Sequence, residues 1–190
     1  MGISISESTT VLHIPYGPFT NEGSPDTGFV DLKAHPEWIS VMPPCLGWPE
    51  TRDLLQAINA PSSPLMTLAA DQAFTAPSQS EFKVALASFV TLCYADLPRN
   101  AKQPLADLAE SLKARISDLL QAVSNELQQR LFLKIVLELQ PTIFHHEDLE
   151  GWSLTVFMAA YGDDEGETRM TWHVGVRALQ EAIIGDDAVR

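Results

Sequence analysis

The sequence predicts an α+β domain in which an antiparallel sheet packs against two or three helices. A leucine-rich run from Pro104 to Gln140 has the apolar spacing of an α-helix. Apolar and polar residues alternate as in strands near the start of the chain and again after Pro141. Strands at both ends with helices between them are typical of an α+β fold and not of a parallel βαβ array.

The chain has 190 residues, which is enough for one domain with a sizeable core. We expect a single domain over 1–190, and three regions within it. Residues 1–48 form a strand plus extended loops, residues 49–140 form a helical middle, and residues 141–190 form a β-hairpin and an acidic tail.

The first region begins with strand formers that alternate over 2–16 and predict a β-strand. Glycines and prolines punctuate 17–49, so turns and extended segments are expected there, with one short strand at Trp38–Met42. A short helix is predicted from Pro49 to Ile58, where the apolar residues share one face.

The middle region predicts a loop or hinge over 61–80, followed by two more helices. One helix is expected between Ser80 and Leu97, because six apolar residues fall on one helical face: Phe82, Leu86, Phe89, Val90, Cys93 and Leu97. The longest helix is expected over about 104–140. Its last part, 131–139, alternates like a strand, but Lys134 and Glu138 have the spacing of a helical ion pair, and we favour the helix.

The last region predicts a β-hairpin near the C-terminus. Trp152–Tyr161 and Thr168–Val176 both alternate, and a turn-rich acidic segment joins them. A short closing helix is expected over Arg177–Ile184, before the acidic tail.

The composition indicates an acidic protein that binds other proteins. The net charge of -13 disfavours contact with nucleic acid and with anionic membranes. Solubility is the preferred explanation of this charge, and a face for a basic protein partner is the alternative. Charged residues make up only 19%, below the roughly 25% of ordinary domains, so we also expect a homo-oligomer. No secretory signal and no apolar run of bilayer length is visible, which predicts a cytoplasmic protein.

One short segment contains the densest set of possible metal ligands: His145, His146, Glu147 and Asp148. These are weak candidates, because Glu150 stands where a His-Glu-x-x-His zinc motif needs its second histidine. A polar turn is the preferred interpretation, and no metal or other cofactor is expected.

Cys45 lies in a proline-rich turn, but no base or orienting group for a thiol nucleophile can be identified beside it. Phosphate loops, dinucleotide-binding glycines and the Gly-x-Ser-x-Gly elbow are all missing from the sequence. We therefore expect a non-enzymatic interaction module, such as an adaptor, a chaperone-like or an inhibitory protein, that acts through an acidic or apolar surface.

The candidate partner surface consists of Trp38, Trp48, Trp152, Asp163, Asp164 and Glu165. The preferred interpretation of the three tryptophans is that they are core residues. The alternative is a small enzyme or ligand-binding protein with a pocket between helices and sheet. Its polar groups would come from four histidines: His13, His145, His146 and His173. His13 and His173 would meet if their predicted strands paired.

Overall fold

The computed structural model describes residues 2–14, 30–77, 81–123 and 132–185. In chain order the elements are β1 (Gly2–Glu7), β2 (Leu12–Ile14), the 3₁₀ helices η1 (Pro36–Val41) and η2 (Pro43–Cys45), α1 (Pro49–Ile58), β3 (Leu65–Thr75), β4 (Val84–Tyr94), the 3₁₀ helix η3 (Leu97–Arg99), α2 (Lys102–Gln121), β5 (Phe132–Phe144), β6 (Leu149–Gly162) and α4 (Glu165–Ile184).

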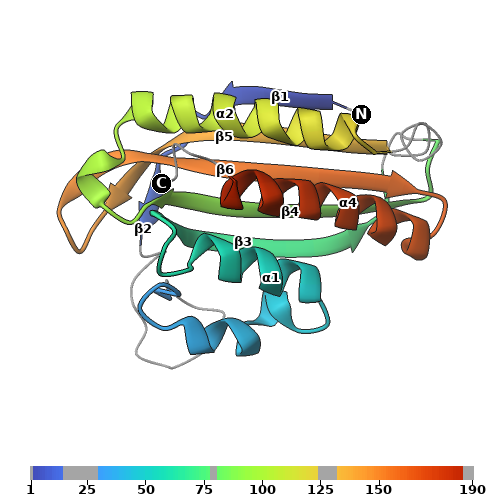
Figure 1. Cartoon of the computed structure of the whole chain (residues 1–190), viewed down its shortest axis with the longest axis horizontal. Helices are drawn as coiled ribbons and strands as arrows, with labels where there is room; N and C mark the ends of the chain where they lie inside the picture. Colours follow the sequence, from blue (N-terminus) through green and yellow to red (C-terminus); the bar gives the residue numbers. More distant parts are fainter. Residues whose placement is uncertain (1, 15–29, 78–80, 124–131, 186–190) are drawn as a thin grey trace.

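The strands form one six-stranded sheet with the order β1-β5-β6-β4-β3, and β2 pairs with β5 beyond the end of β1 (Figure 1). The pairs β3/β4, β4/β6 and β5/β6 are antiparallel, whereas β1 and β2 run parallel to β5. The predicted α+β class is confirmed. The sheet is mixed, however, and its hairpin is formed by β5 and β6.

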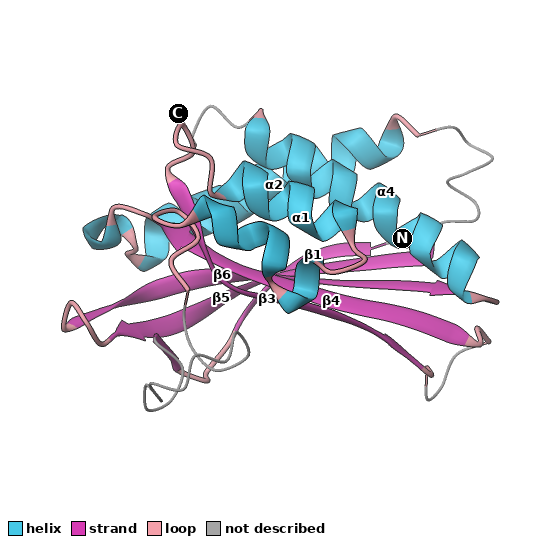
Figure 2. Ribbon diagram, turned by 90° about the horizontal axis from the view of Figure 1, so that it is seen from below, coloured by secondary structure: helices cyan, strands magenta, loops and turns pink. Residues whose placement is uncertain are grey.

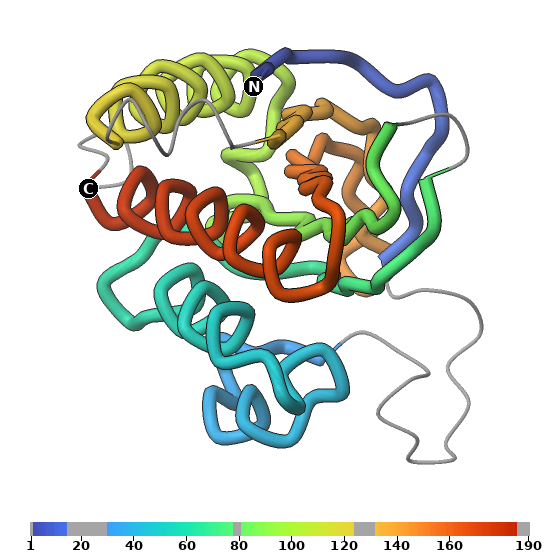
Figure 3. Tube along the Cα trace, turned by 90° about the vertical axis from the view of Figure 1, so that its right-hand side faces the viewer, coloured from blue at the N-terminus to red at the C-terminus, as the bar shows by residue number. Residues whose placement is uncertain are grey.

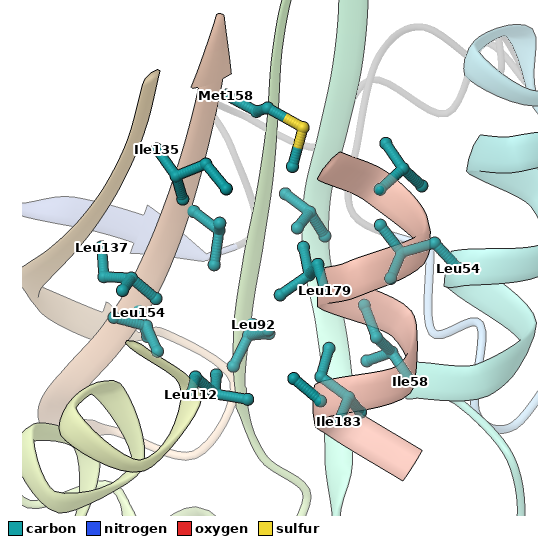
Figure 4. Packing of buried hydrophobic residues seen from close by; sticks show 14 of the residues in the cluster. Leu54, Ile58, Leu92, Leu112, Ile135, Leu137, Leu154, Met158, Leu179 and Ile183 are labelled. Carbon is teal, nitrogen blue, oxygen red and sulfur yellow. The ribbon is translucent and has the colours of Figure 1, made fainter. Parts of the chain in front are cut away.

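The helices α1, α2 and α4 all lie on one side of the sheet (Figures 2 and 3). Their apolar faces and one face of the strands form the main core, part of which is drawn in Figure 4. Leu112 of α2 and Leu179 of α4 are fully buried there, opposite Leu137 and Leu154 of the sheet. Burial of a leucine side chain contributes about 1.5–3 kcal/mol, so this single layer of helices supplies most of the hydrophobic stabilisation.

The prediction of one long helix over 104–140 is wrong in its second half. The helix α2 ends at Gln121, and β5 begins at Phe132. Alternate β5 residues, such as Ile135 and Leu137, are buried beneath the helices. Burying them contributes several kcal/mol, whereas a helical pair between Lys134 and Glu138 contributes only about 0.2–0.5 kcal/mol.

The helix predicted between Ser80 and Leu97 is also wrong, because most of this segment forms strand β4, which lies between β6 and β3 in the sheet. Leu86 and Val90 face the helices, whereas Cys93 packs in a second small core on the opposite face. A strand that is apolar on both faces loses the two-residue period that identifies strands in a sequence. The loop predicted over 61–80 likewise contains strand β3.

The C-terminal hairpin is found only in part. Trp152–Tyr161 lies in β6 as predicted, but 168–176 belongs to the helix α4. The acidic segment caps this helix in a variant of the capping box: the N-cap Asp164 carboxylate accepts from the Glu167 N–H, and the Glu167 carboxylate accepts from the N–H of Asp163, one residue before the N-cap. The predicted closing helix is the second half of α4, and the acidic tail over 186–190 lies outside the described residues.

Three predictions concern the first region of the chain. The N-terminal strand is confirmed as β1 and β2, although residues 15–16 lie outside the described part. The helix over Pro49–Ile58 is confirmed. The short strand at Trp38–Met42 is wrong, because the segment forms most of the 3₁₀ helix η1. No helix among the described residues has the length and apolar composition needed to cross a membrane.

Candidate functional site

One face of the sheet points away from the helices. Neither α1, α2 nor α4 covers it (Figure 2). Strand alternation places Val136 of β5, Phe157 of β6 and Phe89 of β4 on this face, and the strand register sets the three side by side in one row. We call this row and its neighbours Ala159 and Ala87 the sheet-face patch.

Phe157 is the centre of the sheet-face patch. Its side chain is 41% exposed, although it lies on the middle strand of the sheet. Its ring contacts that of Phe89, with ring centroids 6.2 Å apart. Phe89 is half-buried, and the next row carries only the small side chains of Ala159 and Ala87. An exposed aromatic ring among apolar neighbours is typical of contact surfaces.

A second aromatic group continues the same face at the end of the strands. Phe132 is 42% exposed and contacts Phe82 with ring centroids 4.4 Å apart, and Tyr161 lies beside Phe82. In the row between the two aromatic groups, Lys134 adds a positive charge. The two aromatic groups therefore lie on the same face, and the exposed Lys134 separates them.

At the other end of the strands this face becomes polar and then closes. Thr91 and Thr155 share a hydrogen bond of 2.9 Å, and both are buried. Beyond them lies the small second core, which contains Ile14, Met66, Leu68, Cys93 and Phe144. Strand β2 contributes Ile14 to this core, which covers the far end of the face.

A groove of about 630 Å³ connects the sheet-face patch with the edge strand β3. Phe89, Phe157 and Asp71 line its sheet side, and Leu32 and Pro44 line the opposite wall. Since β3 is at the end of the strand order, it has a strand neighbour on one side only, and residues 67–71 of β3 line this groove. Unpaired edge strands are common attachment sites for extended peptides.

The wall opposite β3 is held in place by a half-buried lysine, Lys33. The Lys33 ammonium group donates hydrogen bonds to the carbonyl oxygens of Ala60, Ser63 and Leu65. Burial lowers the pKa of Lys33, and the nearby Asp31 carboxylate only partly offsets this effect. These bonds fix the segment that carries Leu32 to the start of β3, so this wall of the groove is preorganised.

The structure brings two of the candidate histidines together, but in a different combination from the one predicted. His13 Nδ1 and His145 Nε2 are 2.8 Å apart, and both side chains are exposed. His173 is remote from them, because it lies on α4 and contacts the Glu50 carboxylate at 3.4 Å. The predicted meeting of His13 and His173 is therefore wrong, and no histidine lines the groove among the described residues.

His173 belongs to a cluster that joins α1 to α4. The Glu50 side chain is only 12% exposed and accepts a hydrogen bond from Arg169 at 3.2 Å, while the Arg169 guanidinium lies over the Trp48 ring. Burial raises the pKa of Glu50, but hydrogen bonds from its own backbone N–H, Arg169 and His173 outweigh that effect, and the net pKa is lowered. This is a structural ion pair between helices.

The candidate surface tryptophans have different environments. Trp38 is 44% exposed and stacks on His35. Trp48 is half-buried between Phe74 and Trp172, and Trp152 packs against the main core beneath Lys102. Only Trp38 is available as an anchor, and it lies on η1 rather than on the sheet-face patch.

The candidate acidic and metal-binding residues lie in the segments before and after β6. Asp163, Asp164 and Glu165 lie at the start of α4, where Asp164 caps the helix. His145, His146, Glu147 and Asp148 form the exposed turn between β5 and β6, as the preferred interpretation has it. Within the described residues, no three His, Cys, Asp or Glu side chains gather in an arrangement that could hold a metal ion.

Both cysteines are buried and free. Burial raises the pKa of Cys45 to about 11 and that of Cys93 to about 12. A thiol of this kind is protonated at neutral pH and is a poor nucleophile. The prediction that Cys93 acts as a small buried hydrophobic residue is consistent with its full burial, although it lies on a strand.

Sequence reasoning missed the two phenylalanines at the centre of the face. Phe157 lies in the predicted strand 152–161 on the side opposite Leu154 and Val156, and that alternation is the signal that could have found it. Phe89 was missed because a helix was predicted for its segment, so no sheet face was assigned to it. The chain matches no family model, no curated protein and no solved structure, so no activity is carried over to it from another protein.

Proposed function

We propose that this chain is a non-enzymatic interaction module that binds an extended apolar segment of a basic partner protein on the sheet-face patch and in the adjoining groove. The observation that carries the proposal is the exposure of Phe157 at the centre of a sheet face that none of the described helices covers. Adaptor, chaperone-like and inhibitory roles all use a surface of this kind.

The partner's chemistry is argued from charge and shape. The chain carries a net charge of -13, and Asp71 lies at the rim of the groove, so basic residues beside the apolar segment gain electrostatic attraction. An extended segment fits better than a helix, because its alternate side chains can enter the groove while its backbone pairs with β3.

The alternative of an enzyme or ligand-binding protein with a histidine pocket stays a prediction with less support. The cavity between α1, α4 and the sheet has a volume of only about 20 Å³, which is too small for a substrate. The exposed His13 and His145 lie outside the groove.

The test uses a labelled peptide of alternating leucine and lysine, and as its control a peptide of alternating leucine and glutamate. Fluorescence anisotropy is expected to show binding of the lysine peptide alone. Phe157→Ser should weaken that binding by about tenfold, the typical effect of removing a central aromatic anchor. Trp38→Ser, which removes a similarly exposed aromatic residue elsewhere, should leave it unchanged.

Two results would overturn the proposal. If the lysine peptide does not bind, the face has no affinity for basic apolar strands. If Phe157→Ser and Trp38→Ser weaken binding equally, the peptide is held by net charge and not by the sheet-face patch. Both variants keep the charge of the chain, so the comparison isolates the contribution of the phenylalanine.

A further inference from the structure

The contact between His13 and His145 is set up by the main chain. Strand β2 pairs with β5 from Leu12 to Ile14, and the His145 N–H donates to the Ile14 carbonyl oxygen at 2.8 Å, which extends the pairing by one bond. Two histidines that are far apart in the sequence are thus held side by side at the end of the sheet. Their positions do not depend on a contact between their own rings.

The ring nitrogens have the spacing of a chelate. His13 Nδ1 and His145 Nε2 lie 2.8 Å apart, with the ring planes within 14° of parallel, and they share a hydrogen bond for which one of the two nitrogens carries the proton. An ion binds both nitrogens only in the tautomers that place each proton on the other ring nitrogen. Metal–imidazole bonds are about 2.0–2.1 Å long, so two nitrogens in adjacent positions of a square-planar or octahedral ion are about 2.8–3.0 Å apart. A tetrahedral zinc ion needs them about 3.3 Å apart.

We propose that His13 and His145 form a two-nitrogen binding site for a divalent copper or nickel ion. Imidazole nitrogen is a preferred ligand of both ions, and square-planar or tetragonal geometry is typical of them. Both rings are exposed and can turn their lone pairs towards a common ion. The carboxylates of Glu147 and Asp148 in the same turn add negative charge that attracts a divalent cation.

The site leaves coordination positions open. The described residues offer no group of three or more side-chain ligands, so the protein supplies the two nitrogens and water fills the other positions. Such a site exchanges its metal readily and is not needed for folding, unlike a closed structural zinc site. The proposal is independent of the sheet-face patch.

The experiment titrates the untagged, metal-free protein with Cu²⁺ and with Ni²⁺ by isothermal calorimetry. Wild type is expected to bind one ion, copper more tightly than nickel, as the general affinity order requires. His13→Ala and His145→Ala should each weaken binding by at least about tenfold. His35→Ala and His173→Ala are the matched controls, because each removes an exposed histidine that contacts a carboxylate, and they should bind as wild type does.

A second measurement separates metal binding from a change in structure. Copper should increase the hydrogen-exchange protection of residues 12–14 in wild type, because the ion ties β2 to the turn after β5, and it should not do so in His145→Ala. Circular dichroism checks that each variant keeps its fold. Unchanged affinity in both His13→Ala and His145→Ala, or an equal loss in the controls, would overturn the proposal.

Discussion

Two buried threonines lie about one turn apart on α4, and replacing each by valine should change the stability of the fold in opposite directions. Thr171 is 1% exposed, and its hydroxyl finds no hydrogen-bond partner among the described residues. Thr168 is 0% exposed, and its hydroxyl donates to the Asp164 carbonyl oxygen at 2.7 Å. Valine has nearly the same shape as threonine and a similar helix propensity, so replacing either threonine tests the hydroxyl alone.

The magnitudes follow from the cost of burying a polar group. A buried hydroxyl without a partner costs about 1–3 kcal/mol, so Thr171→Val is expected to stabilise the fold by about 1 kcal/mol. Thr168→Val removes a satisfied bond and should destabilise it by about 1 kcal/mol. The Asp164 carbonyl keeps its bond from the Thr168 N–H, so no further group is orphaned.

Thermal unfolding followed by circular dichroism measures both changes. For a chain of this length, about 1 kcal/mol corresponds to a shift in Tm of about 2–4 °C, so the two variants should differ by about 4–8 °C. Destabilisation of Thr171→Val to the same extent as Thr168→Val would refute the reasoning. The Thr171 hydroxyl would then have a partner, and the buried face of α4 would differ from the one described.

Three further predictions test other parts of the fold. The folded pKa of Glu50 is lowered, so its contribution to stability is present above the unfolded value of 4.5 and is lost as the pH falls through the folded pKa. In an acid titration below pH 4.5, Glu50→Gln should therefore lose less stability than wild type. Cys45 and Cys93 should resist iodoacetamide at pH 8 in the native protein and react in urea, as mass spectrometry of the adducts would show, and rapid native labelling would contradict their burial. The expected homo-oligomer should give a light-scattering mass above that of one chain, and a strictly monomeric mass would refute it.

The fold class could be predicted from the sequence because the spacing of apolar residues identifies an amphipathic helix or strand. In α2 the residues Leu105, Leu112 and Ile116 follow helical spacing and all are buried in the main core. The assignment failed where a strand is buried on both faces, as in β4, because local spacing cannot distinguish such a strand from a helix. It also failed at Thr168–Val176, where residues that alternate in sequence belong to a helix whose buried side is broad.

The candidate site was harder to predict than the fold, because it depends on which strands become neighbours. Phe89 and Phe157 are 68 positions apart in the sequence, and only the β4/β6 register places them side by side. The same is true of His13 and His145, which meet through the parallel pairing of β2 with β5. Long-range pairing of this kind leaves no local signal, so sequence reasoning chose the large tryptophans instead.

Charge separates two occupants that compete for the sheet-face patch, a second copy of the chain and a basic partner. Two copies bring together net charges of -13 each, and their repulsion opposes self-association through this face. Added salt screens that repulsion, since the Debye length falls from about 10 Å at 0.1 M to about 3 Å at 1 M. Salt should therefore favour self-association through Phe157 and weaken the binding of the leucine–lysine peptide. If self-association and peptide binding both become stronger as salt is added, apolar contact alone holds the peptide, and the preference for a basic partner is wrong.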